Sequence, residues 1–233
     1  MRCYLVSSYF LLLVKYELLC REMGNMEDEQ QFKKLSPKKL RRLKMDELVM
    51  YRKRERAYLL TTTDEGQIGY KIRQLAHPLL LGALHIYHMA KRIRIKTNGS
   101  VPKARRPMIF AVSHIGMYDV EVVLQAIQKH VYMLSADEEA MYRTFDGWFF
   151  DVNGVIYVDP EDKADKKVSV ETAVKYLAKG RSLLWYPEGT WNLSQNYVIL
   201  PIHYGIIEVA VRTNAVIIPI GLEQYDRAHS IDF

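Results

Sequence analysis

The feature that most constrains the fold of this sequence is a series of short apolar runs separated by stretches with helical periodicity. Each run has four or five residues rich in Val, Ile, Leu and aromatic side chains, which is typical of buried strands. The runs are residues 93–97, 108–112, 131–134, 155–158, 182–186 and 216–220, and helical patterns cover 120–128, 166–178 and 202–211. This alternation predicts an α/β fold, in which a mixed, largely parallel sheet is flanked by helices on both faces.

Two regions of different composition follow one another along the 233 residues. Residues 1–69 are expected to form an N-terminal basic helical region, because Lys and Arg are concentrated there. Residues 70–233 hold all the predicted strands, and a chain of this length supports one hydrophobic core, so we predict a single domain over them. Little sequence follows the last strand, and truncation at the C-terminus is one interpretation of the ending at Phe233.

The N-terminal region is dominated by a block of positive charge. Residues 33–56 contain eleven Lys or Arg and three acidic residues, whereas the whole chain has a formal net charge of +6. Ser36 and Pro37 have the residue types of an N-cap and a first helical position, so they predict a helix that continues to Val49. A basic helix suits an anionic membrane surface or packs on its own domain. Nucleic-acid binding is not expected, because the block lacks interleaved aromatic residues and a helix-turn-helix context.

The most apolar stretch, residues 75–90, contains three histidines and a proline and is bracketed by Arg73 and Lys91. It is too polar to predict a spanning helix, so we expect an interfacial or re-entrant segment. His77, His85 and His88 have no acidic or cysteine partner beside them, and both cysteines fall within the first twenty residues. No metal site is therefore expected.

Chemistry is expected after the run 108–112, where His114 is followed by Asp119 in an H-x4-D pattern. A turn that contains Gly116 can bring the carboxylate at the start of the next helix back to the imidazole at the strand end. The carboxylate would then fix the ring's tautomer and stabilise the ring once it has accepted a proton, as a general base requires. Ser113 invites comparison with serine hydrolases, but no G-x-S-x-G motif is present, and we interpret Ser113 as structural.

A second candidate cluster follows the run 182–186, in the sequence Tyr-Pro-Glu-Gly-Thr. Pro187 is expected to end the strand, and Gly189 allows the backbone to approach a ligand closely. Glu188 is then an acid at a strand end that can orient an acceptor hydroxyl or amine, with Thr190 as a nearby donor. Taken alone, the same sequence is also an ordinary turn.

Together these motifs resemble the conserved blocks of the PlsC-like glycerolipid acyltransferases, which include 1-acylglycerol-3-phosphate and lysophospholipid acyltransferases. Residues 113–119 resemble their first block, N-H-x4-D, with Ser113 where Asn is common. Residues 153–159 are similar to the second block, which has a glycine, apolar residues and an aspartate. Residues 186–190 resemble the third block and 216–220 the fourth, an apolar strand interrupted by proline. The order and spacing agree over roughly residues 70–221.

The resemblance implies an O-acyltransferase that moves a fatty acyl group from acyl-CoA or acyl carrier protein directly to a hydroxyl of a lysophospholipid-like acceptor. It implies no acyl-enzyme, no metal and no other cofactor. It also implies that the protein is membrane-associated at the cytoplasmic face, with the N-terminal helical region resting on the lipid. By the same resemblance His114 and Asp119 are catalytic, and substrates bind at Gly154, Asp159, Glu188, Gly189, Thr190 and Trp191.

Two departures from the family pattern bear on the acceptor. Pro160 stands where arginine usually follows the second-block aspartate, and Trp191 stands where arginine usually follows the third block. Arginine binds phosphate through two parallel hydrogen bonds, which neither replacement can reproduce. An acyltransferase for an acceptor without phosphate is therefore one alternative. A catalytically inactive lipid-binding relative is another, although such a protein has no chemical need for His114, Asp119 and Glu188 together.

Overall fold

The computed structural model describes residues 35–62, 67–103, 105–116, 118–136, 145–194 and 196–223. The chain divides into two compact units, Met1–Leu43 and Lys44–Phe233. The described part of the first unit contains the short helix α2, Pro37–Leu40. The second unit holds the sheet and all the chemistry considered below.

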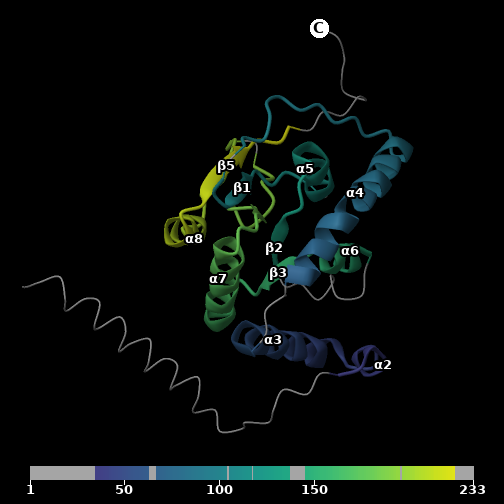
Figure 1. Cartoon of the computed structure of the whole chain (residues 1–233), viewed down its shortest axis with the longest axis vertical. Coiled ribbons are helices and arrows are strands. Elements are labelled where there is room, and N and C mark those ends of the chain that lie inside the picture. Colours follow the sequence, from purple (N-terminus) through teal and green to yellow (C-terminus); the bar gives the residue numbers. More distant parts are fainter. Residues whose placement is uncertain are drawn as a thin grey trace, which may run out of the picture. The chain divides into compact units, whose positions relative to one another are not determined.

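The second unit is built on a parallel sheet with the strand order β3-β2-β4-β1-β5 (Figure 1). Its described strands are β1 (Met108–Val112), β2 (Tyr132–Ala136), β3 (Val155–Val158), β4 (Leu183–Trp185) and β5 (Val216–Ile220). Every pairing among them is parallel, so the sheet is more regular than the mixed sheet that the sequence predicted. Ile109 is fully buried, as expected for a central strand covered on both faces.

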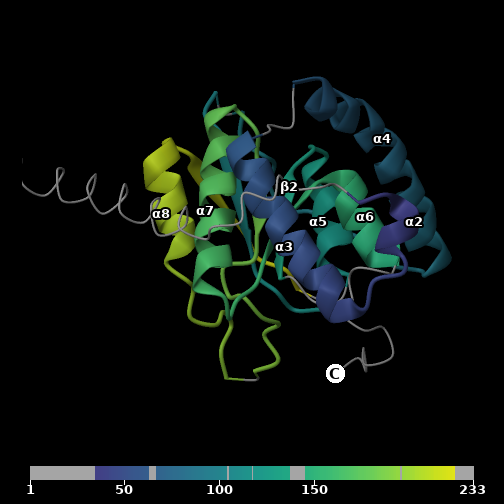
Figure 2. The ribbon, with the colours of Figure 1, turned by 90° about the horizontal axis from the view of Figure 1, so that it is seen from below.

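Helices cover both faces of this sheet (Figure 2). On one face, side chains from α4 (Gln67–Ala90), α5 (Asp119–Ile127) and α6 (Phe145–Asn153) form one core cluster with β1 and β2. On the other face, α7 (Lys163–Ala178) and α8 (Gly205–Thr213) form a second cluster with the alternate residues of the strands. The helix α3 (Met45–Thr62) packs against α7. The prediction of an α/β fold with helices on both faces is confirmed.

Two sequence predictions near the N-terminal side are wrong. Residues 93–97 form no strand: half-buried and exposed side chains alternate there, but the segment pairs with neither edge strand of the sheet. The helix predicted to begin at Pro37 and continue to Val49 ends at Leu40, and α3 begins at Met45 as a separate helix. The new start is stabilised where the Lys44 N–H donates to a Glu47 carboxylate oxygen at 2.9 Å, which satisfies a backbone donor at the helix end.

Residues 75–90 belong to one continuous helix, so the re-entrant interpretation is also wrong. Pro78 lies inside α4 without ending it. Side chains at positions 77, 81, 84 and 88 form the buried stripe of this helix, whereas Leu75 and Leu79 on the opposite side are each 79% exposed. No helix within the described residues is long and apolar enough to cross a membrane.

The glycine at the start of β3 is required by packing, which yields a test of the fold. Gly154 has φ +103°, and a Cβ at this position would lie 2.8 Å from the Tyr132 ring. We predict that Gly154→Ala lowers the free energy of unfolding by about 1–3 kcal/mol, because it combines backbone strain with overpacking. Urea denaturation measures this directly.

The matched control is Gly82→Ala, since Gly82 lies in the helix α4 and no atom lies within 4 Å of a Cβ built there. Alanine favours a helix over glycine by up to about 1 kcal/mol, so this variant should be as stable as the wild type or more stable. Equal midpoints for the two variants would show that Tyr132 does not restrict the position.

Candidate active site

The carboxyl edge of the sheet, where the parallel strands end, carries the first candidate motif. After β1 the Ser113 N–H donates to the Ile220 carbonyl at 3.1 Å, and the Ser113 hydroxyl accepts from the Leu222 N–H at 2.8 Å. These contacts fasten the end of β1 to the end of β5. The hydroxyl is therefore engaged by the backbone, which agrees with the interpretation of Ser113 as structural.

Asp119 folds the H-x4-D loop back on itself. One carboxylate oxygen, Oδ2, accepts from the backbone N–H groups of Ile115 at 2.6 Å and Gly116 at 2.9 Å. The same oxygen lies 2.8 Å from Nδ1 of His114. The carboxylate is at the first residue of α5, where the N–H ends of a helix stabilise negative charge. With Nδ1 directed at Asp119, the His114 ring turns Nε2 away from the carboxylate.

Two aromatic side chains fix the plane of the His114 ring. The Tyr186 ring stacks on it with centroids 4.1 Å apart and planes 22° apart. The Trp191 ring meets it edge-on at 5.9 Å and 86°. The His114 side chain remains 20% exposed, so an incoming substrate can still reach it. A base held on three sides is preorganised for proton transfer.

Glu188 is buried beneath this loop and binds backbone rather than solvent. Its Oε1 accepts from the His114 N–H at 3.0 Å, and its Oε2 accepts from the Leu200 N–H at 2.8 Å. The Asn192 N–H donates to the His114 carbonyl at 2.6 Å. The backbone N–H and C=O of His114 are thus both hydrogen-bonded to the chain that follows β4. In this placement Glu188 positions the His114 backbone, and direct contact of Glu188 with an acceptor stays a prediction.

The remaining third-block residues line the turn after Glu188. Gly189 has φ +70°, and a Cβ there would lie 2.8 Å from Nε2 of His203. The His203 N–H donates to the Pro187 carbonyl at 2.8 Å, so the segment before α8 closes over this turn. Thr190 is exposed next to it. The structure therefore brings Glu188, Gly189, Thr190 and Trp191 to the His114 loop.

The structure does not bring the second-block residues to His114. Gly154 precedes β3 and lies at the opposite, amino edge of the sheet. Asp159 follows β3 on the carboxyl edge, but β3 is three strands away from β1, which is about 14 Å at the usual spacing of strands. Neither residue therefore contacts the His114 loop, and a role for Gly154 and Asp159 in substrate binding stays a prediction.

Asp159 joins α3 to the sheet. Its carboxylate pairs with the Lys53 ammonium, which also lies 3.4 Å from Asp162. The hydrogen bond from Lys53 lowers the pKa of Asp159, and the same contact raises the pKa of Lys53. One residue of the basic N-terminal block therefore packs against its own domain.

Tyr186 is a site residue to which the sequence gave no role. Burial raises the pKa of its phenol well above the ordinary value, and the nearby carboxylates of Asp119 and Glu121 add to this effect. The phenol thus stays neutral under physiological conditions. Its hydroxyl oxygen has no hydrogen-bond partner within the described residues. The aromatic residue at the end of β4 was visible in the sequence, but its stacking on a residue 72 positions earlier was not.

Cationic side chains do not contact the described residues of the site. Arg106 donates to the Asn214 side chain at 3.0 Å, at the amino edge of the sheet and away from His114. No Lys or Arg is among the partners of His114, Asp119, Glu188 or Trp191 in the part of the chain that the structure describes. The same described residues contain no group of three or more His, Cys, Asp or Glu that could hold a metal.

Comparison with known proteins places this site in a family. Residues 92–223 match the model of the family described as Acyltransferase, and the chain therefore belongs to that family. This confirms the resemblance seen in the motifs.

Individual relatives are distant. The chain is 23% identical over 137 residues to a 1-acyl-sn-glycerol-3-phosphate acyltransferase of Saccharomyces cerevisiae, which covers 58% of this chain and 45% of the relative. It is 23% identical over 129 residues to an uncharacterised acyltransferase of Schizosaccharomyces pombe, with 55% and 46% covered. The chain thus spans less than half the length of both relatives. Its fold also aligns with the crystal structure of the 1-acyl-sn-glycerophosphate (LPA) acyltransferase PlsC from Thermotoga maritima. The TM-score is 0.47 at 16% identity, over 75% of this chain and 64% of that one.

The two hydrogen bonds of Glu188 predict a local loss of stability in Glu188→Gln. A glutamine has one acceptor oxygen, so one of the two backbone N–H groups would face an amide NH2, and leaving it unpaired costs about 1–3 kcal/mol. We expect faster hydrogen exchange at the amides of His114 and Leu200. Glu171→Gln is the control, because Glu171 pairs with Arg212 at the surface and should cost less than about 1 kcal/mol. Unchanged protection of both amides would contradict the role given to Glu188.

Proposed function

We propose that the protein transfers a fatty acyl group from a thioester, acyl-CoA or acyl carrier protein, to the hydroxyl of a lysolipid-like acceptor. Family membership supports the reaction class, and the His114–Asp119 contact at the end of β1 is the observation that carries the mechanism. Nε2 of His114 accepts the proton of the acceptor hydroxyl while the hydroxyl oxygen attacks the thioester carbonyl carbon. The C–S bond then breaks, the thiolate takes up the proton from His114, and an ester and a free thiol leave.

The proposal predicts opposite results at two adjacent residues. His114→Ala should lower the rate of acyl transfer by about 10² to 10⁴, because the general base is lost. Ser113→Ala should keep the rate within about tenfold of the wild type, because its hydroxyl binds the Leu222 backbone and takes no part in the chemistry. Thiol release from acyl-CoA in the presence of a lysolipid acceptor measures both.

Two outcomes would contradict the mechanism. A loss in Ser113→Ala as large as that in His114→Ala would favour a serine nucleophile and an acyl-enzyme. Wild-type protein without transfer to any lysolipid, from either donor, would favour the inactive lipid-binding alternative.

We further propose that the acceptor lacks a phosphomonoester. Trp191 lies edge-on to the His114 ring and stands where the family resemblance expects an arginine, and Pro160 stands in place of the other arginine. A phosphate dianion brought to this site without a cation loses its hydration without charge-assisted hydrogen bonds in return, which costs several kcal/mol. A neutral or amine-bearing head can pack against the indole instead.

A competition assay tests the acceptor. With lysophosphatidic acid offered beside a lysolipid that lacks the phosphomonoester, the wild type should prefer the latter. Trp191→Arg should raise the relative use of lysophosphatidic acid by at least about tenfold, the value of one charge-assisted contact. Tyr197→Arg adds the same charge at an exposed aromatic residue of the same loop and should change the preference less. A wild-type preference for lysophosphatidic acid would contradict the inference.

A membrane surface is the proposed location of this reaction. The support is the outer side of α4, where Ile72, Leu75, Leu79, Ile86 and Met89 are exposed. An amphipathic helix with such a side can bury it at the headgroup boundary of a bilayer. The basic residues of the N-terminal block would add attraction to anionic lipid, on the order of 1 kcal/mol each near the surface.

Vesicle binding provides the test. The double variant Leu75→Ser, Leu79→Ser should bind anionic vesicles at least about tenfold more weakly than the wild type, because a buried Leu contributes about 1.5–3 kcal/mol. Val211→Ser is the control, since Val211 is 77% exposed on α8, on the other face of the sheet. Equal binding by all three proteins would remove α4 from the membrane contact.

A further inference from the structure

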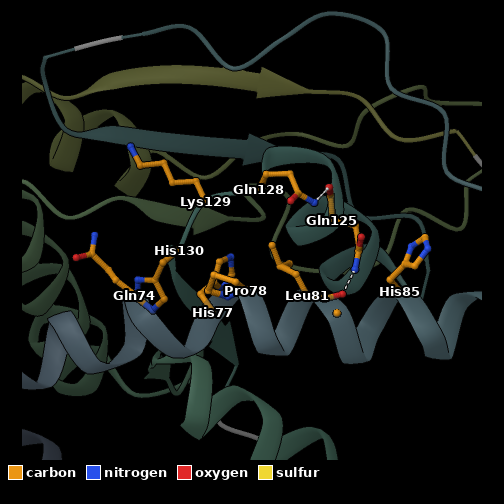
Figure 3. A pocket seen from close by; sticks show the side chains of 10 residues that line it. Gln74, His77, Pro78, Leu81, His85, Gln125, Gln128, Lys129 and His130 are labelled. Atoms are coloured by element: carbon orange, nitrogen blue, oxygen red, sulfur yellow. Dashed lines mark hydrogen bonds between the residues drawn. The ribbon is translucent and has the colours of Figure 1, made fainter.

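A groove between α4 and α5 lies away from the candidate active site and takes no part in the proposed reaction. Its volume is about 620 Å³, within the range of ligand sites. Figure 3 shows side chains of α4 on one side of the groove and those of the segment 125–130 on the other. That segment contains the C-terminal end of α5 and leads into β2, so the groove lies at the amino edge of the sheet. We name it the α4–α5 groove; it is lined by Gln74, His77, Pro78, Leu81, Gly82, His85, Gln125, Gln128, Lys129 and His130.

The groove carries positive charge without a matching acid. Lys129 is half-buried, and its ammonium has no ion-pair or hydrogen-bond partner within the described residues. Burial lowers the pKa of this ammonium, and no carboxylate opposes the effect. None of the lining residues is Asp or Glu. Partly burying a cation without a counter-ion costs free energy, and a bound anion reduces that cost.

Neutral polar side chains line the α4 side of the groove. His77 is 5% exposed, and neither of its ring nitrogens has a hydrogen-bond partner of good geometry within the described residues. Burial lowers the pKa of His77, while the Asn153 side chain and the Lys129 backbone lie close enough to oppose that effect weakly. His85 and Gln74 extend the polar lining along α4. The amide nitrogens of Gln74, Gln125 and Gln128 already donate within the protein, so the Lys129 ammonium is the main group left to bind an oxyanion such as phosphate.

The outer side of α4 adds an apolar neighbour to this polar groove. Leu75, Leu79 and Ile86 each follow a lining residue directly in the sequence and are exposed. A ligand with a phosphate head and an apolar body would therefore find both of its parts accommodated.

We propose that the α4–α5 groove binds a phosphate group, with Lys129 as its main charge partner. The phosphate comes either from a lipid headgroup or from free phosphate, and both present the same oxyanion to the groove. This site is separate from His114, so acyl transfer in solution does not report on it.

Inorganic phosphate is the first probe. Histidine imidazole resonances of the full chain should shift in a saturable way as phosphate replaces chloride at constant ionic strength. Lys129→Gln should weaken this binding at least about tenfold, since a hydrogen bond to a charged group is lost. Lys129→Arg keeps the charge and should keep most of the affinity. Lys166→Gln removes an exposed charge from α7, on the other face of the sheet, and should bind like the wild type.

A lipid arm then identifies the source. Vesicles of phosphatidylcholine that contain phosphatidic acid should compete with inorganic phosphate for the same histidine signals if the headgroup is the source. If free phosphate is the source, the vesicles leave the phosphate affinity unchanged.

The proposal is overturned if the wild type shows no saturable shift or if Lys129→Gln binds phosphate as the wild type does. Lys129 also stands just after the C-terminus of α5, where a cation stabilises the helix dipole. A purely structural role there would lower the melting temperature of Lys129→Gln without changing the phosphate affinity, so measuring both quantities separates the two roles.

Discussion

The arrangement of the candidate site depends on a single carboxylate oxygen, Oδ2 of Asp119. It binds two backbone N–H groups of the loop that follows β1 and contacts Nδ1 of His114. The backbone contacts fix the path of the loop, and the contact with the ring fixes which ring nitrogen faces away from the carboxylate. Because Asp119 is also the first residue of α5, the position of that helix and the direction of the imidazole are set together. Glu188 repeats this principle from the other side by holding the His114 peptide to the chain after β4.

Much of the fold follows from patterns within single elements. β1, β3 and β5 begin and end at the predicted residues, because short apolar runs of four or five residues are a clear signal of buried strands. The helix α6 was not predicted, since its sequence combines Gly147 with clustered aromatic residues that obscure the helical period. Residues 93–97 have a strand-like alternation, but they pair with neither edge strand of the sheet. Strand order is a property of the whole chain, and local pattern does not contain it.

The same distinction separates the site residues that were predicted from those that were not. His114 and Asp119 are five residues apart, so one turn decides whether they meet, and sequence reasoning can address one turn. The contacts of Glu188 with His114 and of Tyr186 with its ring join segments more than seventy residues apart. Gly154 and Asp159 were predicted to bind substrate by family resemblance, and the position of β3 at the edge of the sheet, three strands from β1, could not be predicted from their sequence block. Asp159 holds α3 through Lys53.

The central claim is that Asp119 acts through the His114 ring, and a double-mutant cycle on acyl transfer measures this most directly. The second-order rate constants of the wild type, Asp119→Asn, His114→Ala and the double variant give the coupling between the two side chains. The account predicts that Asp119→Asn alone lowers the rate about 10²-fold or more, and that it lowers the rate little further once His114 is alanine. If the two losses instead multiply in the double variant, Asp119 contributes independently of the ring, and the account is contradicted.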